Sequence, residues 1–321
     1  MTAYFRVYGL AVAVSGWPEV VEAVRLDYAW FEAEPIERPD VVVEIEQGAP
    51  ELDRFGDLTA SYLTPDGVVF RRPDRTVVDH GGRAVSVVDR GGDRLQLRGE
   101  DEPTVQGAAY YFVLGRIGRH LDDRSLVRLH SLGVVGAQGA VAILLPPGGG
   151  KTTLALRALE AEGVSLLSED SPVLDRRGDL HPFPLRIAVA AGEGRPVDAR
   201  SVQAKGAIEV ESFADRVATT SAPLRHVVVG RRSLARGGRL DPLPRRAAVL
   251  PLLREGVVGV GVYQGLGYAH QRGGAELAAK LVTAARRAAA CYGALAGAGT
   301  WQLTLGRDPE LNWDALSPLL R

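Results

Sequence analysis

The sequence predicts an α/β protein in two parts: a β-rich α+β domain with a linking helix over residues 1–123, and a second α/β domain over residues 124–321. Three observations predict this division. Short β-rich runs separated by Gly, Pro and Asp turn signals fill residues 58–98. A charged turn at residues 122–124 precedes a new set of apolar runs. Among these, the run 141–145 leads through consecutive glycines into a helix-forming segment, which is the strand–loop–helix order of an α/β unit.

The elements of the first part follow from hydrophobic periodicity and turn residues. Residues 4–14 predict one strand, and residues 17–19 begin a helix with an approximate helical period of apolar positions. The segment after residue 58 predicts a meander of antiparallel strands, and residues 102–104 begin the linking helix. Further strands are expected at residues 40–46, 67–70, 76–79, 84–88 and 95–97, and the linking helix is expected to end near residue 121.

The second part begins with short strands and then alternates strand and helix. A helix begins at Lys151, and the next strand, residues 163–168, ends directly before Glu169 and Asp170. The chain between Lys151 and this acidic pair is too short for another strand–helix excursion, so we expect the strand 163–168 to lie beside the strand 141–145. The other strands expected in this part are residues 126–130 and 133–135.

The glycine segment has the residue types of a phosphate-binding P-loop. Glycines allow backbone N–H groups to turn inward around phosphate oxygens, and the following helix adds its positive end. Lys151 would reach the outer phosphates, and the Thr152 hydroxyl would hold Mg²⁺. The full pattern would have glycine at position 145, where this chain has Leu145 followed by two prolines of fixed φ. The alternative is a plain Gly/Pro-rich turn. The predicted phosphate contacts are Pro147, Gly148, Gly149, Gly150, Lys151, Thr152 and Thr153.

The acidic pair suits the chemistry of such a loop. Carboxylates at the end of a neighbouring strand are where this kind of fold places its Mg²⁺ ligand and the group that orients or deprotonates the attacking nucleophile. Glu169 and Asp170 occupy that place, so the predicted metal ligands are Thr152, Glu169 and Asp170. The alternative is an acidic turn, because an acidic pair after a strand is common by itself.

Composition argues against several classes of protein. A net charge of -1 and a pI near 6.6 argue against a general binder of nucleic acid or anionic membranes, so we expect neither partner. The basic segment with Arg231 and Arg232 is interpreted as a solvated loop. Cys291 is the lone cysteine, which excludes an intrachain disulfide framework and fits a reducing cytoplasm. No targeting or membrane-spanning segment is expected.

These segments together resemble a known family. Leu129-His130, the run Gly-Gly-Gly-Lys-Thr-Thr and the run Leu-Leu-Ser-Glu-Asp resemble the catalytic core of HPr kinase/phosphorylase and the HPr kinase-related proteins. Those proteins share a P-loop fold with phosphoenolpyruvate carboxykinase. The resemblance covers residues 125–185 by motif and the rest, including the tail 300–309, in outline. Glu169 stands where the family usually has aspartate, and the later signature loop of true HPr kinases is missing, so HPr itself is not the expected substrate.

The resemblance implies a P-loop kinase domain of the HPr kinase C-terminal type, which uses ATP and Mg²⁺. It implies that Asp170 is the general base toward an acceptor hydroxyl and that His130 tunes this carboxylate or contacts phosphate. Arg186, with His181 close by in the sequence, would contact the transferred phosphate, since Arg suits bidentate phosphate recognition. The alternatives are a structural strand histidine at 130 and a structural loop at 181–186. The predicted catalytic residues are His130, Lys151, Glu169, Asp170 and Arg186.

Three functions are compatible with this interpretation. The leading one is an ATP-dependent kinase that transfers phosphate to a serine-like hydroxyl of a peptide or protein, a tailoring kinase for a small ribosomal peptide being one form. A small-molecule kinase is the first alternative. A nucleotide-binding regulator without catalysis is the second, and the irregular loop permits it. The sequence lacks the constellation expected for phosphoenolpyruvate carboxykinase activity. The resemblance also makes self-association a reasonable expectation.

Overall fold

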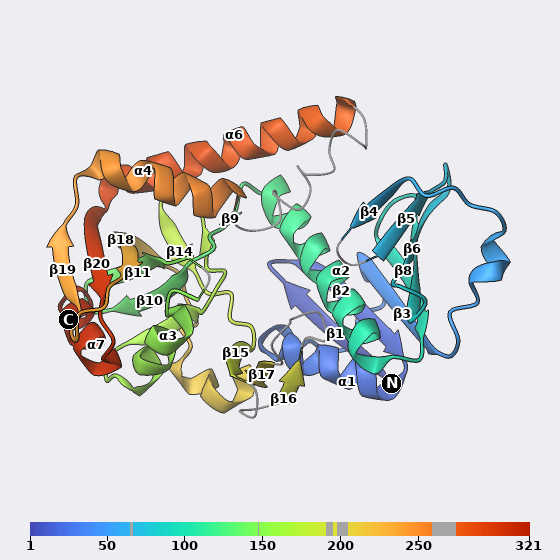
Figure 1. Ribbon diagram of the computed structural model, residues 1–321, viewed down its shortest axis with the longest axis horizontal. Helices are drawn as coiled ribbons and strands as arrows, with labels where there is room; N and C mark the ends of the chain where they lie inside the picture. Colours follow the sequence, from blue (N-terminus) through green and yellow to red (C-terminus); the bar gives the residue numbers. More distant parts are fainter. Residues whose placement is uncertain (65–66, 147, 191–194, 198–204, 259–273) are drawn as a thin grey trace. The chain divides into compact units, whose positions relative to one another are not determined.

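The structure is a computed structural model that combines helices with several β-sheets (Figure 1). This confirms the mixed α/β class predicted from the sequence. The residues that it describes are 1–64, 67–146, 148–190, 195–197, 205–258 and 274–321. The chain separates into two compact units, Met1–His120 with Arg186–Ser212, and Leu121–Leu185 with Phe213–Arg321. These units differ from the predicted division into consecutive segments at residues 123 and 124, because Arg186–Ser212 returns to the first unit.

A mixed sheet forms the body of the first unit, with the strand order β1-β2-β3-β8-β7-β6-β5-β4. Strands β4 to β8 pair antiparallel with their sequence neighbours, which confirms the predicted meander. Strands β2, β3 and β8 pair in parallel. The bounds are β1 (Thr2–Val7), β2 (Leu10–Gly16), β3 (Val41–Gln47), β4 (Tyr62–Thr64), β5 (Gly67–Arg71), β6 (Arg75–Asp79), β7 (Ala84–Asp89) and β8 (Arg94–Gly99).

The prediction of a single strand over residues 4–14 is wrong. β1 and β2 form an antiparallel hairpin whose innermost pair is Val7 and Leu10. Tyr8 and Gly9, between the two strands, have φ angles of 51° and 88°. A two-residue hairpin turn of type I′ requires positive φ at both central positions. Because apolar residues stand on both sides of the turn, the hydrophobic pattern alone continues across it.

Helices complete the first unit. Helix α1 (Pro18–Asp27) buries Val20, Val21 and Val24 and packs against β1 and β2. Helix α2 (Glu102–Asp123) confirms the predicted linking helix. The returning segment contributes a separate antiparallel sheet in the order β15-β17-β16. The remaining bounds are η1 (Ala29–Phe31), η2 (Leu52–Phe55), β15 (Ile187–Ala190), β16 (Arg195–Val197), β17 (Lys205–Ile208) and η3 (Val210–Arg216).

The second unit contains a sheet in the order β12-β10-β11-β18-β14-β13-β9, with β20 paired to β18 and β19. Because β11 and β20 both run parallel to β18, the carboxyl ends of these strands meet at one edge of the sheet. The bounds are β9 (Val127–Arg128), β10 (Leu132–Gly136), β11 (Gly139–Leu144), β12 (Ser165–Ser168), β13 (Val173–Leu174), β14 (Asp179–His181), β18 (Ala222–Arg232), β19 (Arg239–Pro242) and β20 (Gly299–Leu305).

The prediction that the strand before the acidic pair lies beside the strand before the glycine loop is wrong. β12 pairs with β10 and not with β11, because the β10–β11 hairpin places β10 between them. Both pairings are antiparallel, so β12 still points the same way as β11. The acidic pair after β12 therefore lies at the same edge of the sheet as the glycine loop after β11.

Helices cover both faces of this sheet (Figure 1). α3 (Lys151–Glu160) and α7 (Pro309–Leu316) contact each other on one side, and α4 (Arg245–Leu253) and α6 (Gly274–Gly297) contact each other on the other. η4 (Arg254–Val258) continues α4, and η5 (Ser317–Leu319) follows α7. Leucines from the sheet and from α4 and α6 form one buried cluster, whose removal from water stabilises the unit. Within the described residues, no helix has the length and apolar character needed to cross a membrane.

Candidate active site

The glycine segment between β11 and α3 shapes the amino end of α3. Gly148 and Gly150 have φ angles of 69° and 105°, a region that residues with a Cβ rarely adopt. The backbone N–H of Gly149 donates to the carbonyl oxygen of Pro146 at 2.8 Å and closes the turn. No described side chain caps α3, so the first N–H groups of the helix present their positive end to an anion. Pro147, a predicted phosphate contact, lies outside the described residues.

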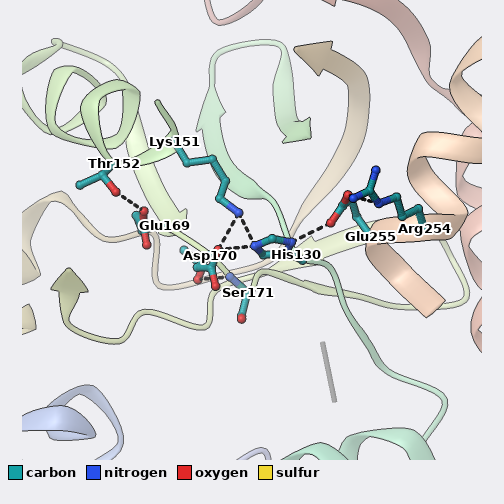
Figure 2. Close-up of polar contacts among 9 residues, drawn as sticks. His130, Lys151, Thr152, Glu169, Asp170, Ser171, Arg254 and Glu255 are labelled. Carbon is teal, nitrogen blue, oxygen red and sulfur yellow. Dashed lines mark hydrogen bonds and ion pairs between the residues drawn. The ribbon is translucent and has the colours of Figure 1, made fainter. Parts of the chain in front are cut away.

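Lys151 is the first residue of α3, and its amino group meets residues from two other segments (Figure 2). Its side chain is 8% exposed. Nζ lies 2.7 Å from Oδ1 of Asp170 and 2.5 Å from Nε2 of His130. His130 follows β9, and Asp170 follows β12. The fold therefore brings an ammonium, an imidazole and a carboxylate together from three places in the sequence.

Both ring nitrogens of His130 have carboxylate partners. Nε2 lies 3.1 Å from Oδ1 of Asp170, and Nδ1 lies 2.7 Å from Oε2 of Glu255. The hydrogen bonds to Asp170 and Glu255 raise the pKa of His130 to about 9, against the opposing effect of burial. In its charged form the ring donates to both carboxylates. The short contact between Nε2 and the Lys151 amino group is then a hydrogen bond only if one of the two nitrogens gives up a proton.

The two carboxylates after β12 are in different electrostatic environments. Burial alone would raise the pKa of Asp170, but the hydrogen bond from His130 and the charge of Lys151 outweigh it and lower this pKa. Burial and the neighbouring Asp170 charge raise the pKa of Glu169. The turn that carries the pair is closed by a 3.0 Å hydrogen bond from the Ser171 N–H to the Ser168 hydroxyl. Asp170 is 51% exposed, so an ionised carboxylate faces solvent beside Lys151.

Thr152 and Glu169 form the oxygen pair that suits a magnesium ion. The Thr152 hydroxyl donates to Oε1 of Glu169 at 2.7 Å, and Thr153, on the same first turn, is exposed. Within the described residues, no group of three or more His, Cys, Asp or Glu side chains is arranged to hold a metal ion. Mg²⁺ in phosphate-transfer sites is usually held by one or two protein carboxylates together with substrate phosphates and water. The hydroxyl–carboxylate pair fits that arrangement.

Arg186, a predicted contact of the transferred phosphate, binds residues of the first unit. It belongs to the first unit, where its Nη1 lies 2.6 Å from Oδ1 of Asp27, which is fully buried. Its guanidinium also lies over the Tyr110 ring, 4.6 Å from the centroid. His181, which the sequence places close to Arg186, has its Nε2 3.1 Å from Oδ2 of Asp175 within the second unit. These contacts connect Arg186 to the first unit.

Replacing Arg186 by methionine is expected to lower the free energy of unfolding by about 3 kcal/mol, because the buried Asp27 carboxylate loses its charged partner. Urea unfolding of the full chain measures this change. The double variant Arg186→Met, Asp27→Asn should recover part of the loss, since no charge is then left buried. A change within about 0.5 kcal/mol for the single variant, as at ordinary surface positions, would show that the pair of Arg186 and Asp27 does not stabilise the fold.

Two residues at the site were not predicted from the sequence. Glu255, in η4, holds Nδ1 of His130, and no motif in its surroundings marks it. Arg232 ends β18, and a Cβ added to Gly150 would lie 3.2 Å from its Nη1. The sequence showed Arg232 only as one of a group of arginines. The parallel pairing of β18 with β11 places the end of β18 at the glycine loop, and the sequence does not report this pairing.

Comparison with known proteins gives no family assignment: no protein-family model matches the chain, and no curated protein has a significantly similar sequence. Chemically, the arrangement offers cations and backbone donors for phosphate oxygens and an oxygen pair for a divalent cation. It also offers an ionised carboxylate held by an imidazole. Groups of these kinds can position and neutralise a phosphoryl group.

Proposed function

We propose that the protein is an ATP-dependent kinase that transfers the γ-phosphate to a hydroxyl, of serine type, on a peptide or protein. In this proposal the second unit is a P-loop kinase domain of the HPr kinase type. The observation that carries it is the position of Lys151. This residue directly follows the glycine loop, and its amino group touches both Asp170 and His130. Phosphoryl transfer depends mainly on positioning and charge neutralisation, which these residues can provide.

In this proposal, different residues bind the phosphates and the metal ion. The N–H groups of Gly148 and Gly150, with Lys151 and Arg232, bind phosphate oxygens, since all lie at the amino end of α3. Thr152 and Glu169 hold Mg²⁺, and Asp170 is close enough in sequence to share this task. When bound, the ion neutralises charge on the phosphates. The predicted metal ligands therefore keep their roles in the proposal.

Asp170 takes the proton of the acceptor hydroxyl, because it is the exposed carboxylate of the pair. While Lys151 contacts it, its pKa stays low and it is a weak base. When Lys151 turns to the phosphates, one of the charges that lower this pKa moves away and the carboxylate becomes more basic. Asp170 would thus gain basicity only after nucleotide binds.

Replacing Arg232 by glutamine is expected to weaken ATP binding about tenfold, the effect of losing one charge-assisted hydrogen bond to phosphate. Isothermal calorimetry of the full chain with Mg²⁺ and ATP measures it. Arg239→Gln is the matched control, because Arg239 is 71% exposed and paired with Asp241. Equal affinities for the two variants would remove Arg232 from the phosphate site.

The proposed function is tested with γ-labelled ATP and Mg²⁺, incubated with the purified protein and an extract of its source cells, and resolved by size. Label in a peptide or protein with the wild type, and none with Asp170→Asn, would establish the kinase and identify the acceptor for mapping. Label in a small molecule would establish the first alternative, a small-molecule kinase.

A regulator without catalysis is favoured by one observation: Lys151 and Asp170, the phosphate-binding cation and the base, are paired with each other. If that pair persists with nucleotide bound, neither group reaches its target. ATP binding by calorimetry, with neither transfer nor phosphate release in the labelled assay, would support this alternative and contradict the kinase.

A further inference from the structure

Glu255 contacts the site from a distant part of the chain. It lies in η4, 125 residues after His130, and is 8% exposed. Its side chain and backbone both bind the same residue: Oε2 is 2.7 Å from Nδ1 of His130 (Figure 2), and its carbonyl accepts the His130 N–H at 3.1 Å. Nε of Arg254 lies 3.6 Å from Oε1 of Glu255, and the Arg254 side chain is largely exposed. Among the contacts drawn in Figure 2, His130 is therefore the closer partner of the Glu255 carboxylate.

The packing around η4 fixes where this carboxylate sits. Gly256 lies against the Cys291 sulfur on α6, and a Cβ at position 256 would collide with that sulfur. Arg287, also on α6, is 3.5 Å from the Gly256 carbonyl oxygen through Nη1. The same guanidinium binds Asp122 with two bonds, at 2.7 and 2.8 Å. Because these contacts hold the backbone, a side-chain change at position 255 alters the bond to His130 without moving the segment.

A carboxylate at Nδ1 determines the form of a neutral imidazole. Glu255 accepts from Nδ1 and cannot donate to it, whereas the Lys151 ammonium donates to Nε2 and cannot accept from it, so a neutral ring carries its proton on Nδ1 and its lone pair on Nε2. Nε2 is the atom that faces Asp170 and Lys151. Without the acceptor, the ring is free to place the proton on Nε2 or to turn over, and the edge that it presents to Asp170 changes.

We propose that Glu255 is a positioning residue for the phosphoryl transfer assigned above: it holds His130 by Nδ1 so that Nε2 is fixed against Asp170. The role of Glu255 in phosphoryl transfer rests on the proposed function. The contact itself is a property of the free protein. A carboxylate behind a histidine typically fixes the ring orientation, and removing such a partner costs about tenfold to a hundredfold in activity at metal sites.

The test uses two variants of the full chain, Glu255→Leu and Glu255→Gln. Leucine removes the acceptor at similar size, whereas glutamine keeps an acceptor oxygen without the charge. Nitrogen NMR of ¹⁵N-histidine-labelled protein, with the His130 signal assigned from its loss in His130→Asn, reads the ring form at alkaline pH. We expect an Nδ1 proton in the wild type and in Glu255→Gln, and an Nε2 proton in Glu255→Leu.

Kinetics link the ring form to the reaction. Glu255→Leu should lower kcat about tenfold to a hundredfold, with the KM for ATP within about threefold, and Glu255→Gln should restore much of kcat. Arg239→Gln is the control, because Arg239 is 71% exposed and pairs with Asp241. An unchanged ring form in Glu255→Leu, or a changed ring form with wild-type kcat, would overturn the inference. If the wild type transfers no phosphate, the proposed function fails and so does this role in it, while the spectra still show whether Glu255 orients His130.

Discussion

Asp170→Asn is expected to lower kcat for phosphoryl transfer about a hundredfold to ten-thousandfold, to the limit of detection, while ATP affinity stays within a few fold. Asparagine keeps the size of the side chain but cannot take the proton of an acceptor hydroxyl, and a positioned general base contributes rate factors of this size. Binding is spared because Asp170 contacts Lys151 in the free protein, so its loss releases the lysine for phosphate. Labelled-phosphate transfer and calorimetry on the same preparation measure the two effects.

Glu169→Gln is the informative comparison for this experiment. Glu169 binds the Thr152 hydroxyl, so its replacement should raise the Mg²⁺ concentration needed for half-maximal rate and leave most of the rate at saturating Mg²⁺. Near wild-type transfer by Asp170→Asn would remove the base assignment. If Glu169→Gln were then inactive at saturating Mg²⁺, the roles of the two carboxylates would be exchanged.

The features of the site that are local in sequence could be predicted from the sequence. The spacing of glycines, lysine and threonine at 148–153 sets a loop and the start of a helix, because φ restrictions and helix geometry act over a few residues. The meander of β4 to β8 is local in the same way, with turn residues between alternating strands. The hairpin at Tyr8-Gly9 was missed because tyrosine is an unusual residue at a positive φ.

Features that depend on long-range packing could not be predicted in this way. Arg186 pairs with a residue 159 positions earlier, and Glu255 with one 125 positions earlier. Neither partnership leaves a periodic or spaced signal in the chain. The sheet order is also long-range: the position of β10 between β12 and β11 depends on which strand edges pair, and the sequence interval from Lys151 to Asp170 does not report it.

Lys151→Ala is expected to weaken ATP binding and to slow phosphoryl transfer. ATP affinity should be lower by at least about tenfold and kcat by at least about a hundredfold. The amino group is 8% exposed at the amino end of α3, so its charge acts in a poorly solvated place where phosphate would be neutralised. Its removal also takes away one of the charges that hold down the pKa of Asp170. Calorimetry and single-turnover transfer separate the effect on binding from the effect on chemistry.

Two further variants separate charge from shape. Lys151→Arg keeps the charge, but a planar guanidinium is larger than the space around Nζ, between His130 at 2.5 Å and Asp170 at 2.7 Å, so it should restore little activity. Lys280→Ala removes a lysine on α6 and should leave both measurements unchanged. Wild-type ATP affinity in Lys151→Ala would show that the glycine loop does not bind phosphate, because a buried cation at the first residue of α3 cannot be neutral toward a polyanion bound there.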